Sequence, residues 1–140
     1  MAMPPPEPPM PTDAELAILN VLWAHGPSTV REVHERLERD EPIGYTTVLK
    51  LLQIMLEKGL VARDESQRAH VYTAAVSEPA TQRRLLDDLM ERAFGGSARR
   101  LVMQALDGER VSPDELDEIR ALLDQLDAQN DDGDPDGRNA

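Results

Sequence analysis

The stretch that decides the fold of this 140-residue chain runs from Gly44 to Ala74 and reads GYTTVLKLLQIMLEKGLVARDESQRAHVYTA. Its first half has apolar side chains at helical spacing and polar side chains mostly on the other side, which predicts an amphipathic helix. The apolar positions are Val48, Leu52, Met55 and Leu56, and the polar positions are Thr46, Thr47, Lys50 and Gln53. We expect Gly59 to end this helix, because glycine is common just after a helix C-terminus.

The second half of the stretch favours two short β-strands. Residues 60–63 and 70–73 are β-leaning runs separated by the polar segment 64–68, an order that is typical of a hairpin with a charged tip. A helix that leads directly into such a hairpin is the pattern of a winged helix, and we call the hairpin the wing. This pattern makes a DNA-binding regulator a better interpretation than an enzyme.

Two capping boxes predict helices upstream of this stretch. Thr12 with Glu15, and Thr29 with Glu32, have the spacing at which a hydroxyl and a carboxylate each accept a hydrogen bond from a free backbone N–H. The predicted order in residues 12–76 is therefore helix, helix, helix, strand, strand.

Beyond Val76 the pattern is helical only. Gly95-Gly96 is expected to separate two helices, and Ser112 followed by Pro113 predicts the start of a third. Apolar stripes on these helices would stay exposed if the helices lay only beside the small domain of residues 12–76, so we expect a second copy of the chain to cover them. The residues predicted at this homodimer interface are Leu85, Leu89, Phe94, Leu101, Leu116, Ile119, Leu123 and Leu126.

The expected fold is mainly α with a small two- to three-stranded β wing. It consists of a winged helix-turn-helix domain followed by a C-terminal α-helical dimerisation region. The predicted boundaries are a disordered proline-rich leader at residues 1–11, a winged-helix DNA-binding domain at 12–76, a helical dimerisation domain at 77–127 and a disordered acidic tail at 128–140.

Composition limits the function classes. The chain has no cysteine, which excludes disulfides, thiolate metal sites and a cysteine nucleophile. Its three histidines lack metal-ligand spacing, and no catalytic triad, phosphate-binding loop or dinucleotide fingerprint is present, so we expect no metal, no cofactor and no enzymatic activity. No apolar run approaches the roughly 20 residues that cross a bilayer, so we expect a soluble, cytoplasmic protein without a membrane partner.

The net charge of −12 counts against a nucleic-acid ligand, because lysine and arginine contacts to phosphate supply much of such binding. The charge is unevenly distributed. Residues 12–76 carry 10 acidic and 7 basic side chains, whereas residues 77–140 carry 16 and 8. The acidic excess is therefore concentrated away from the candidate DNA-reading helix.

The first turns of that helix carry the candidate base contacts. Thr46, Thr47 and Lys50 occupy the part that reaches base edges in helix-turn-helix proteins, and Gln53 follows one turn later. Hydroxyl, ammonium and amide groups can contact bases or phosphates in the major groove. The opposing interpretation is an ordinary solvated helix face.

Further candidate contacts lie in the wing and at the start of the second helix. Arg63 and Arg68 bracket the wing tip and can contact the phosphate backbone, although two acids lie in the same segment. Arg31, with Ser28 and Thr29, can hold a phosphate at a helix N-terminus.

Seven short motifs occur in a characteristic order along the chain: Ala14-Glu15, Val21-Leu22-Trp23, Thr29-Val30-Arg31-Glu32-Val33, Tyr45-Thr46-Thr47-Val48, Lys58-Gly59-Leu60, Arg68-Ala69-His70-Val71-Tyr72 and Phe94-Gly95-Gly96-Ser97. In these motifs the chain resembles the penicillinase-repressor family, also called BlaI/MecI, over about residues 12–126. The resemblance implies a dimeric transcriptional repressor whose winged helices bind an inverted-repeat operator in double-stranded DNA and whose C-terminal helices hold the dimer.

The chain also departs from the family pattern. The Asn-Phe pair associated with cleavage in the best-known members is absent near Gly95 to Val102, so release by a protease or by another signal is left open. The cysteine cluster of the copper-sensing branch is absent, which excludes that route of metal-triggered release. Gln67 stands where a glycine usually precedes the wing arginine.

Two alternative functions remain at this point. The first is a MarR- or PadR-like regulator that senses a small ligand. The second is a protein-binding winged-helix adaptor that does not bind DNA, which the net charge of −12 supports somewhat.

Overall fold

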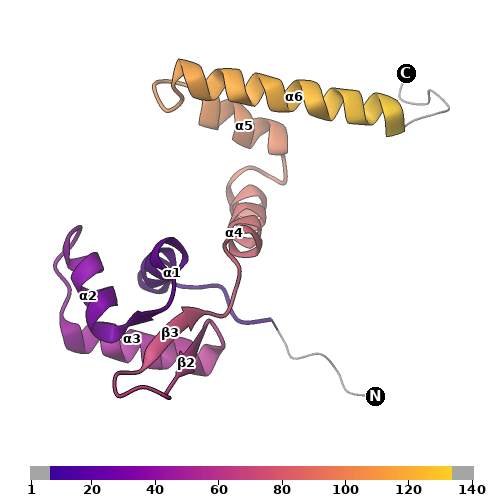
Figure 1. The fold of residues 1–140 in the computed structure, drawn as a ribbon. Helices are drawn as coiled ribbons and strands as arrows, with labels where there is room; N and C mark the ends of the chain where they lie inside the picture. Colours follow the sequence, from indigo (N-terminus) through magenta and orange to yellow (C-terminus); the bar gives the residue numbers. More distant parts are fainter. Residues whose placement is uncertain (1–6, 134–140) are drawn as a thin grey trace, which may run out of the picture. The chain divides into compact units, whose positions relative to one another are not determined.

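The computed structural model describes residues 7–133 of the chain. Residues 1–6 of the predicted leader and residues 134–140 of the predicted tail lie outside this range. The chain divides into two compact units, residues 1–88 and 89–140, and we call the first unit the head. In chain order the elements are α1 (Asp13–His25), β1 (Ser28–Thr29), α2 (Val30–Glu38), α3 (Tyr45–Lys58), β2 (Val61–Asp64), β3 (Val71–Ala74), α4 (Glu78–Ala93), α5 (Ala98–Leu106) and α6 (Pro113–Gly133) (Figure 1).

The predicted helix boundaries in the head have the expected local causes. The Thr12 hydroxyl accepts a hydrogen bond from the Glu15 N–H at 3.2 Å, and the Glu15 carboxylate accepts one from the Thr12 N–H at 2.9 Å. The same reciprocal pair joins Thr29 and Glu32 at the start of α2. At the other end of α3, Gly59 adopts φ 82°, a left-handed conformation that favours glycine and ends the helix.

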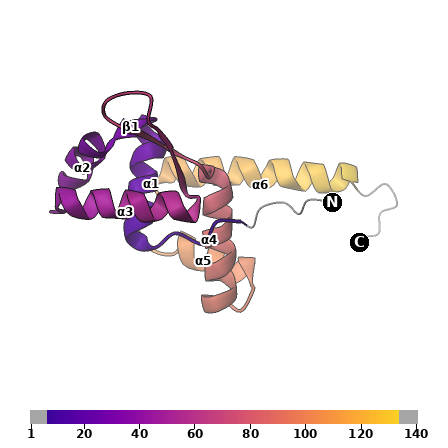
Figure 2. The ribbon, with the colours of Figure 1, turned by 90° about the horizontal axis from the view of Figure 1, so that it is seen from below.

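The sheet has three antiparallel strands in the order β1-β3-β2. The two wing strands begin one residue later than the sequence predicts, a difference within the usual uncertainty of element boundaries. The third strand is β1, only two residues long, in which Ser28 pairs with Tyr72 and Thr29 with Val71. The pairing of β1 with β3 joins the wing to the start of α2 (Figure 2).

The hydrophobic core lies entirely in the head. Its eleven buried apolar residues are Ile18, Leu19, Leu22, Val30, Val33, Val48, Leu52, Met55, Leu60, Val61 and Tyr72. The apolar face predicted for α3 therefore does pack into a core, because Val48, Leu52 and Met55 are all 0% exposed. The Trp23 indole N–H adds a hydrogen bond of 3.0 Å to the Val76 carbonyl.

The helices of the second unit lack such a core. None of residues 89–131 is buried. Glycines with positive φ at positions 95 and 96 separate α4 from α5, as predicted, and reciprocal hydrogen bonds between Ser112 and Glu115 begin α6. α6 continues to Gly133, six residues into the segment predicted as tail, because no glycine or proline interrupts it before that position.

The described part of the leader is attached to the head. Residues 7–11 form neither helix nor strand, yet the Arg84 Nη1 of α4 donates a hydrogen bond of 2.8 Å to the Pro8 carbonyl. The Arg84 Nε also lies 3.8 Å from the Glu7 carboxylate. Proline residues reduce the entropy that this extended segment loses on docking. Arg84 therefore anchors the leader.

A largely buried ion pair joins the start of α1 to the end of α3. Lys58 Nζ lies 2.7 Å from Glu15 Oε2, and the Glu15 side chain is 2% exposed. Burial alone would raise the pKa of Glu15, but the hydrogen bonds from Lys58 and Thr12 and the charge of Lys58 lower the pKa below its ordinary value of 4.5. The folded state therefore favours the ionised form of Glu15.

We expect Glu15→Gln to reduce the acid sensitivity of folding. Because the folded-state pKa of Glu15 is lowered, its stabilisation is complete above about pH 4.5 and is lost as the pH falls through the lowered value. The variant should lose about 1–3 kcal/mol of unfolding free energy at pH 7 and show a shallower decline between pH 5 and 3. Thermal melts across this pH range measure both effects, with Glu57→Gln, an exposed carboxyl of α3, as control. Parallel pH curves for wild type and Glu15→Gln would contradict this role.

We also expect Arg84→Ala to lower the melting temperature more than Arg83→Ala does. The first change removes the hydrogen bond to Pro8 and costs about 0.5–1.5 kcal/mol, whereas Arg83 is exposed and its replacement should stay within about 0.5 kcal/mol. Equal melting temperatures for the two variants would show that the leader contact does not stabilise the head.

Candidate nucleic-acid interface

The exposed face of α3 carries all four predicted base-contacting residues. Thr46, Thr47, Lys50 and Gln53 are exposed. Their positions follow from the helical period, since the residues between them that point the other way form the core. The structure thus presents these four side chains on one accessible helix.

The N-terminus of α3 differs from those of the two preceding helices. α1 and α2 begin with capping boxes and carry acidic side chains in the first turn, whereas α3 begins at Gly44 with no side-chain cap and no acid in its first turn. The first N–H groups of α3 are therefore left to an outside acceptor, next to Thr46 and Thr47. The partial positive charge of a helix N-terminus favours an anion at such a place.

A hollow of about 420 Å³ lies beside this helix end, between the start of α2 and the wing. It is lined by Thr29, Val30, Arg31, Tyr45, Leu49, Arg68, Ala69, His70 and Tyr72. The loop between β2 and β3 passes close to β1 here (Figure 2). The structure therefore brings together predicted contacts from two separate parts of the chain, namely Thr29 and Arg31 at the start of α2 and Arg68 in the wing.

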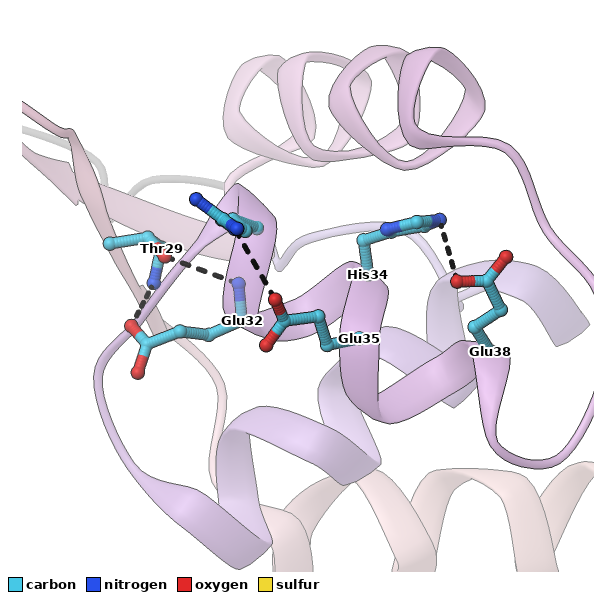
Figure 3. Close-up of polar contacts among 6 residues, drawn as sticks. Thr29, Glu32, His34, Glu35 and Glu38 are labelled. Carbon is cyan, nitrogen blue, oxygen red and sulfur yellow. Dashed lines mark hydrogen bonds and ion pairs between the residues drawn. The ribbon is translucent and has the colours of Figure 1, made fainter.

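At the start of α2, the backbone N–H groups of Thr29 and Glu32 already have hydrogen-bond partners within the chain. Figure 3 shows Thr29 and Glu32 joined by their two reciprocal hydrogen bonds. The hydrogen bonds from the Thr29 N–H and hydroxyl lower the pKa of Glu32, so its carboxylate is charged at this helix end. Part of the space that a phosphate would use at Thr29 therefore already holds a negative charge.

Ser28 has a structural environment that its sequence position does not reveal. Its side chain is 0% exposed, donates a hydrogen bond of 2.9 Å to the Gly26 carbonyl and accepts one of 3.1 Å from Arg36. A hydroxyl held in this way does not reach the surface, because β1 places it under the sheet. We therefore leave Ser28 out of the interface proposed below.

The two wing arginines, Arg63 and Arg68, differ in their exposure and in their contacts. Arg68 is exposed, and no ion pair of Arg68 is found within residues 7–133. Arg63 is 28% exposed and contacts the Glu65 carboxylate. A hydrogen bond to Tyr72, together with Glu65, raises the pKa of Arg63. Arg63 is thus held against the wing by residues of its own chain.

The wing turn needs no glycine. The Asp64 carboxylate accepts a hydrogen bond of 2.9 Å from the Ser66 N–H, which shapes the turn and lowers the pKa of Asp64. No non-glycine residue in the described chain has a positive φ, so Gln67 is accommodated before Arg68 without backbone strain. The departure from the family pattern at this position therefore has a local explanation.

One residue that the sequence reasoning missed positions the start of α3. His34 Nε2 lies 2.8 Å from the Ile43 carbonyl, and its ring meets the Tyr45 ring edge-on at 5.8 Å. Glu38 Oε2 lies 3.5 Å from the same nitrogen (Figure 3). These contacts cross the turn between α2 and α3. A lone histidine on a helix carries no sequence signal for this role.

The predicted dimerisation residues divide into two groups by exposure. Leu89, Leu123 and Leu126 are 49%, 57% and 46% exposed. The other five are partly buried: Leu85, Phe94, Leu101, Leu116 and Ile119. Four further large apolar side chains of α4, α5 and α6 are also exposed, namely Leu86, Val102, Met103 and Leu122.

No group of three or more possible metal-binding side chains comes together within residues 7–133. Within the same range, no helix combines the length and the apolar character needed to cross a membrane.

Comparison with known proteins identifies the family. The model of the penicillinase repressor family matches residues 11–125. The chain belongs to the penicillinase repressor family. This membership confirms the resemblance to the BlaI/MecI group. Because the family is one of transcriptional repressors, it also confirms the predicted repressor function and the prediction that the chain is not an enzyme.

Two curated relatives agree with this assignment. The transcriptional regulator BlaI of Mycobacterium tuberculosis is 34% identical over 117 residues, covering 83% of this chain and 84% of that protein. The penicillinase repressor of Bacillus licheniformis is 24% identical, covering 81% and 89%. A solution structure of the DNA binding domain of the repressor BlaI is 28% identical and covers 51% of this chain and 88% of that one, with a TM-score of 0.47.

Proposed function

We propose that this cytoplasmic protein represses transcription as a homodimer that binds an inverted-repeat operator in double-stranded DNA. Thr46, Thr47 and Lys50 act in the major groove, with Gln53 one turn further along α3. The two recognition helices of the dimer then lie about one helical turn of DNA, roughly 34 Å, apart. A protease or another signal ends repression by releasing the dimer from the operator.

The observation that carries this proposal is the open N-terminal end of α3. It combines exposed hydroxyl and ammonium groups, free backbone N–H groups and the absence of an acid in the first turn. At α1 and α2 the chain satisfies the first N–H groups with its own side chains, whereas the start of α3 has no side-chain cap. The start of α3 suits an anionic, hydrogen-bonding polymer that enters from outside.

Contacts beside α3 support a position on the phosphate backbone. Arg68 from the wing and Arg31 from α2 line the same hollow next to Tyr45, so they approach the strand that flanks the recognition helix. Arginine contacts of this kind position a protein on DNA and carry little sequence information. Arg63 is the more restrained member of the group.

The exposed apolar side chains of the C-terminal helices support the dimer. Large aliphatic residues at about half exposure on three helices, in a unit without buried residues between positions 89 and 131, require a covering surface. A second copy provides one with twofold symmetry, which matches an inverted repeat. Two linked heads also bind far more tightly than one.

We expect Thr47→Ala and Lys50→Ala to weaken binding to DNA from upstream of the protein's own gene by at least about 1 kcal/mol per head, because each removes a base or phosphate contact. Electrophoretic mobility shifts on that duplex measure the loss. Gln82→Ala, an exposed polar change on α4, serves as the control and should bind like wild type. Unchanged affinity in both α3 variants would remove this helix from the interface. A ligand-dependent rise in melting temperature would favour a ligand-sensing regulator instead.

We expect full-length protein to have twice the mass of its 15.6 kDa chain at micromolar concentration, and Leu123→Asp to shift it toward the monomer. A buried charge at an apolar interface is costly unless it is paired. Gln125→Asp places the same charge two residues away on α6, off the apolar stripe, and should remain dimeric. Light scattering after size exclusion gives the masses. A monomeric wild type would refute the dimer.

A further inference from the structure

Two glutamates hold arginines that the proposed interface needs. Arg31 Nε lies 3.3 Å from Glu35 Oε1 on the next turn of α2, and Arg63 Nη2 contacts Glu65 Oε1 in the wing. The glutamate side chains are 59% and 56% exposed, so neither pair is part of the core. Figure 3 shows Glu35 on the same exposed stretch of α2 as Glu32.

Fold stability does not explain these carboxylates. Exposed ion pairs contribute little to folding, and neither glutamate caps a helix. The pairing of β2 with β3, in which Arg63 lies opposite the 1% exposed core residue Tyr72, fixes the backbone at Arg63 independently of Glu65. What Glu65 changes is the net charge that Arg63 presents to the outside.

Both pairs lie where the proposed DNA complex places phosphates. Arg31 lines the hollow beside the start of α3, and Arg63 lies one residue before the tip end of strand β2 in the wing. A phosphate that approaches either arginine meets a carboxylate already bound to it. The carboxylate must be displaced, or it remains and repels the phosphate.

We propose that Glu35 and Glu65 compete with DNA phosphates for Arg31 and Arg63, and thereby keep the affinity of a single head for DNA low. This inference rests on the proposed function. Non-specific binding comes almost entirely from phosphate contacts, whereas operator binding adds base contacts and a second head. Competition for the arginines therefore makes stable binding depend on an inverted repeat.

The test uses full-length protein and a random-sequence duplex of roughly 30 base pairs, about three helical turns. Affinity is measured by fluorescence anisotropy at about 50 mM and 200 mM salt, because phosphate contacts weaken as salt rises. Glu65→Gln and Glu35→Gln should each raise the affinity about two- to five-fold per head at the lower salt, the range for one exposed ion pair. Asp87→Asn makes the same charge change on an exposed position of α4 and should have no such effect.

Variants that lack the arginine separate competition for that arginine from general repulsion between the glutamate and DNA. In Arg63→Gln, adding Glu65→Gln should no longer raise the affinity, because the arginine that the glutamate holds is absent. The same logic applies to Glu35→Gln in an Arg31→Gln background. An equal gain with and without the arginine would overturn the proposal, and so would the absence of any gain in the single variants.

Failure of this inference and failure of the proposed function give different results. If wild type binds the duplex at low salt and the glutamate variants bind equally well, only the competition is wrong. If neither wild type nor the variants bind any duplex at low salt, the DNA-binding function itself is wrong. Melting curves of each variant confirm that these exposed substitutions leave the head folded.

Discussion

The position of α3 depends on one carboxylate. Glu15 accepts the capping hydrogen bond from Thr12 with one oxygen and the Lys58 ammonium with the other, so the start of α1 and the end of α3 meet at a single 2%-exposed side chain. Removing Lys58 would be costly, because Glu15 would be left buried and charged. Gly59 ends α3 at the same place, with Pro8 of the leader nearby. The C-terminal end of α3 is therefore closed by protein contacts.

The opposite end of α3 is held differently. His34 reaches across the turn to the Ile43 carbonyl and Tyr45, which places the first residue of the helix without using its backbone N–H groups. A helix fixed in this way at both ends is preorganised for binding, so little ordering is needed when DNA is contacted. The arrangement leaves one open helix end for an outside partner.

Local signals made much of the fold predictable. Capping boxes, the Gly59 helix end, the apolar period of α3 and the polar wing tip each depend on residues within a few positions of one another, and each was found in the structure. Contacts between distant segments have no such signal. Lys58 lies 43 residues from Glu15, and Arg84 lies 76 residues from Pro8.

The candidate site shows the same division between local and distant contacts. The exposed face of α3 follows from its sequence period, and the structure places the four predicted residues there. Burial of Ser28 depends on a two-residue strand that pairs with β3, and Arg63 lies opposite Tyr72 only because β2 pairs with β3. Neither can be predicted from spacing along the chain. The net charge of a segment also does not predict the interface, because it does not show which acidic side chains pair with which basic ones.

We propose that two copies of this head bind one inverted repeat. Footprinting of the purified full-length protein on DNA from upstream of its own gene shows whether they do. The expected result is a protected region with two half-sites in inverted orientation, about one helical turn apart, which disappears as the salt concentration rises. The absence of any protected site at low salt, or protection of a single half-site, would contradict the claim.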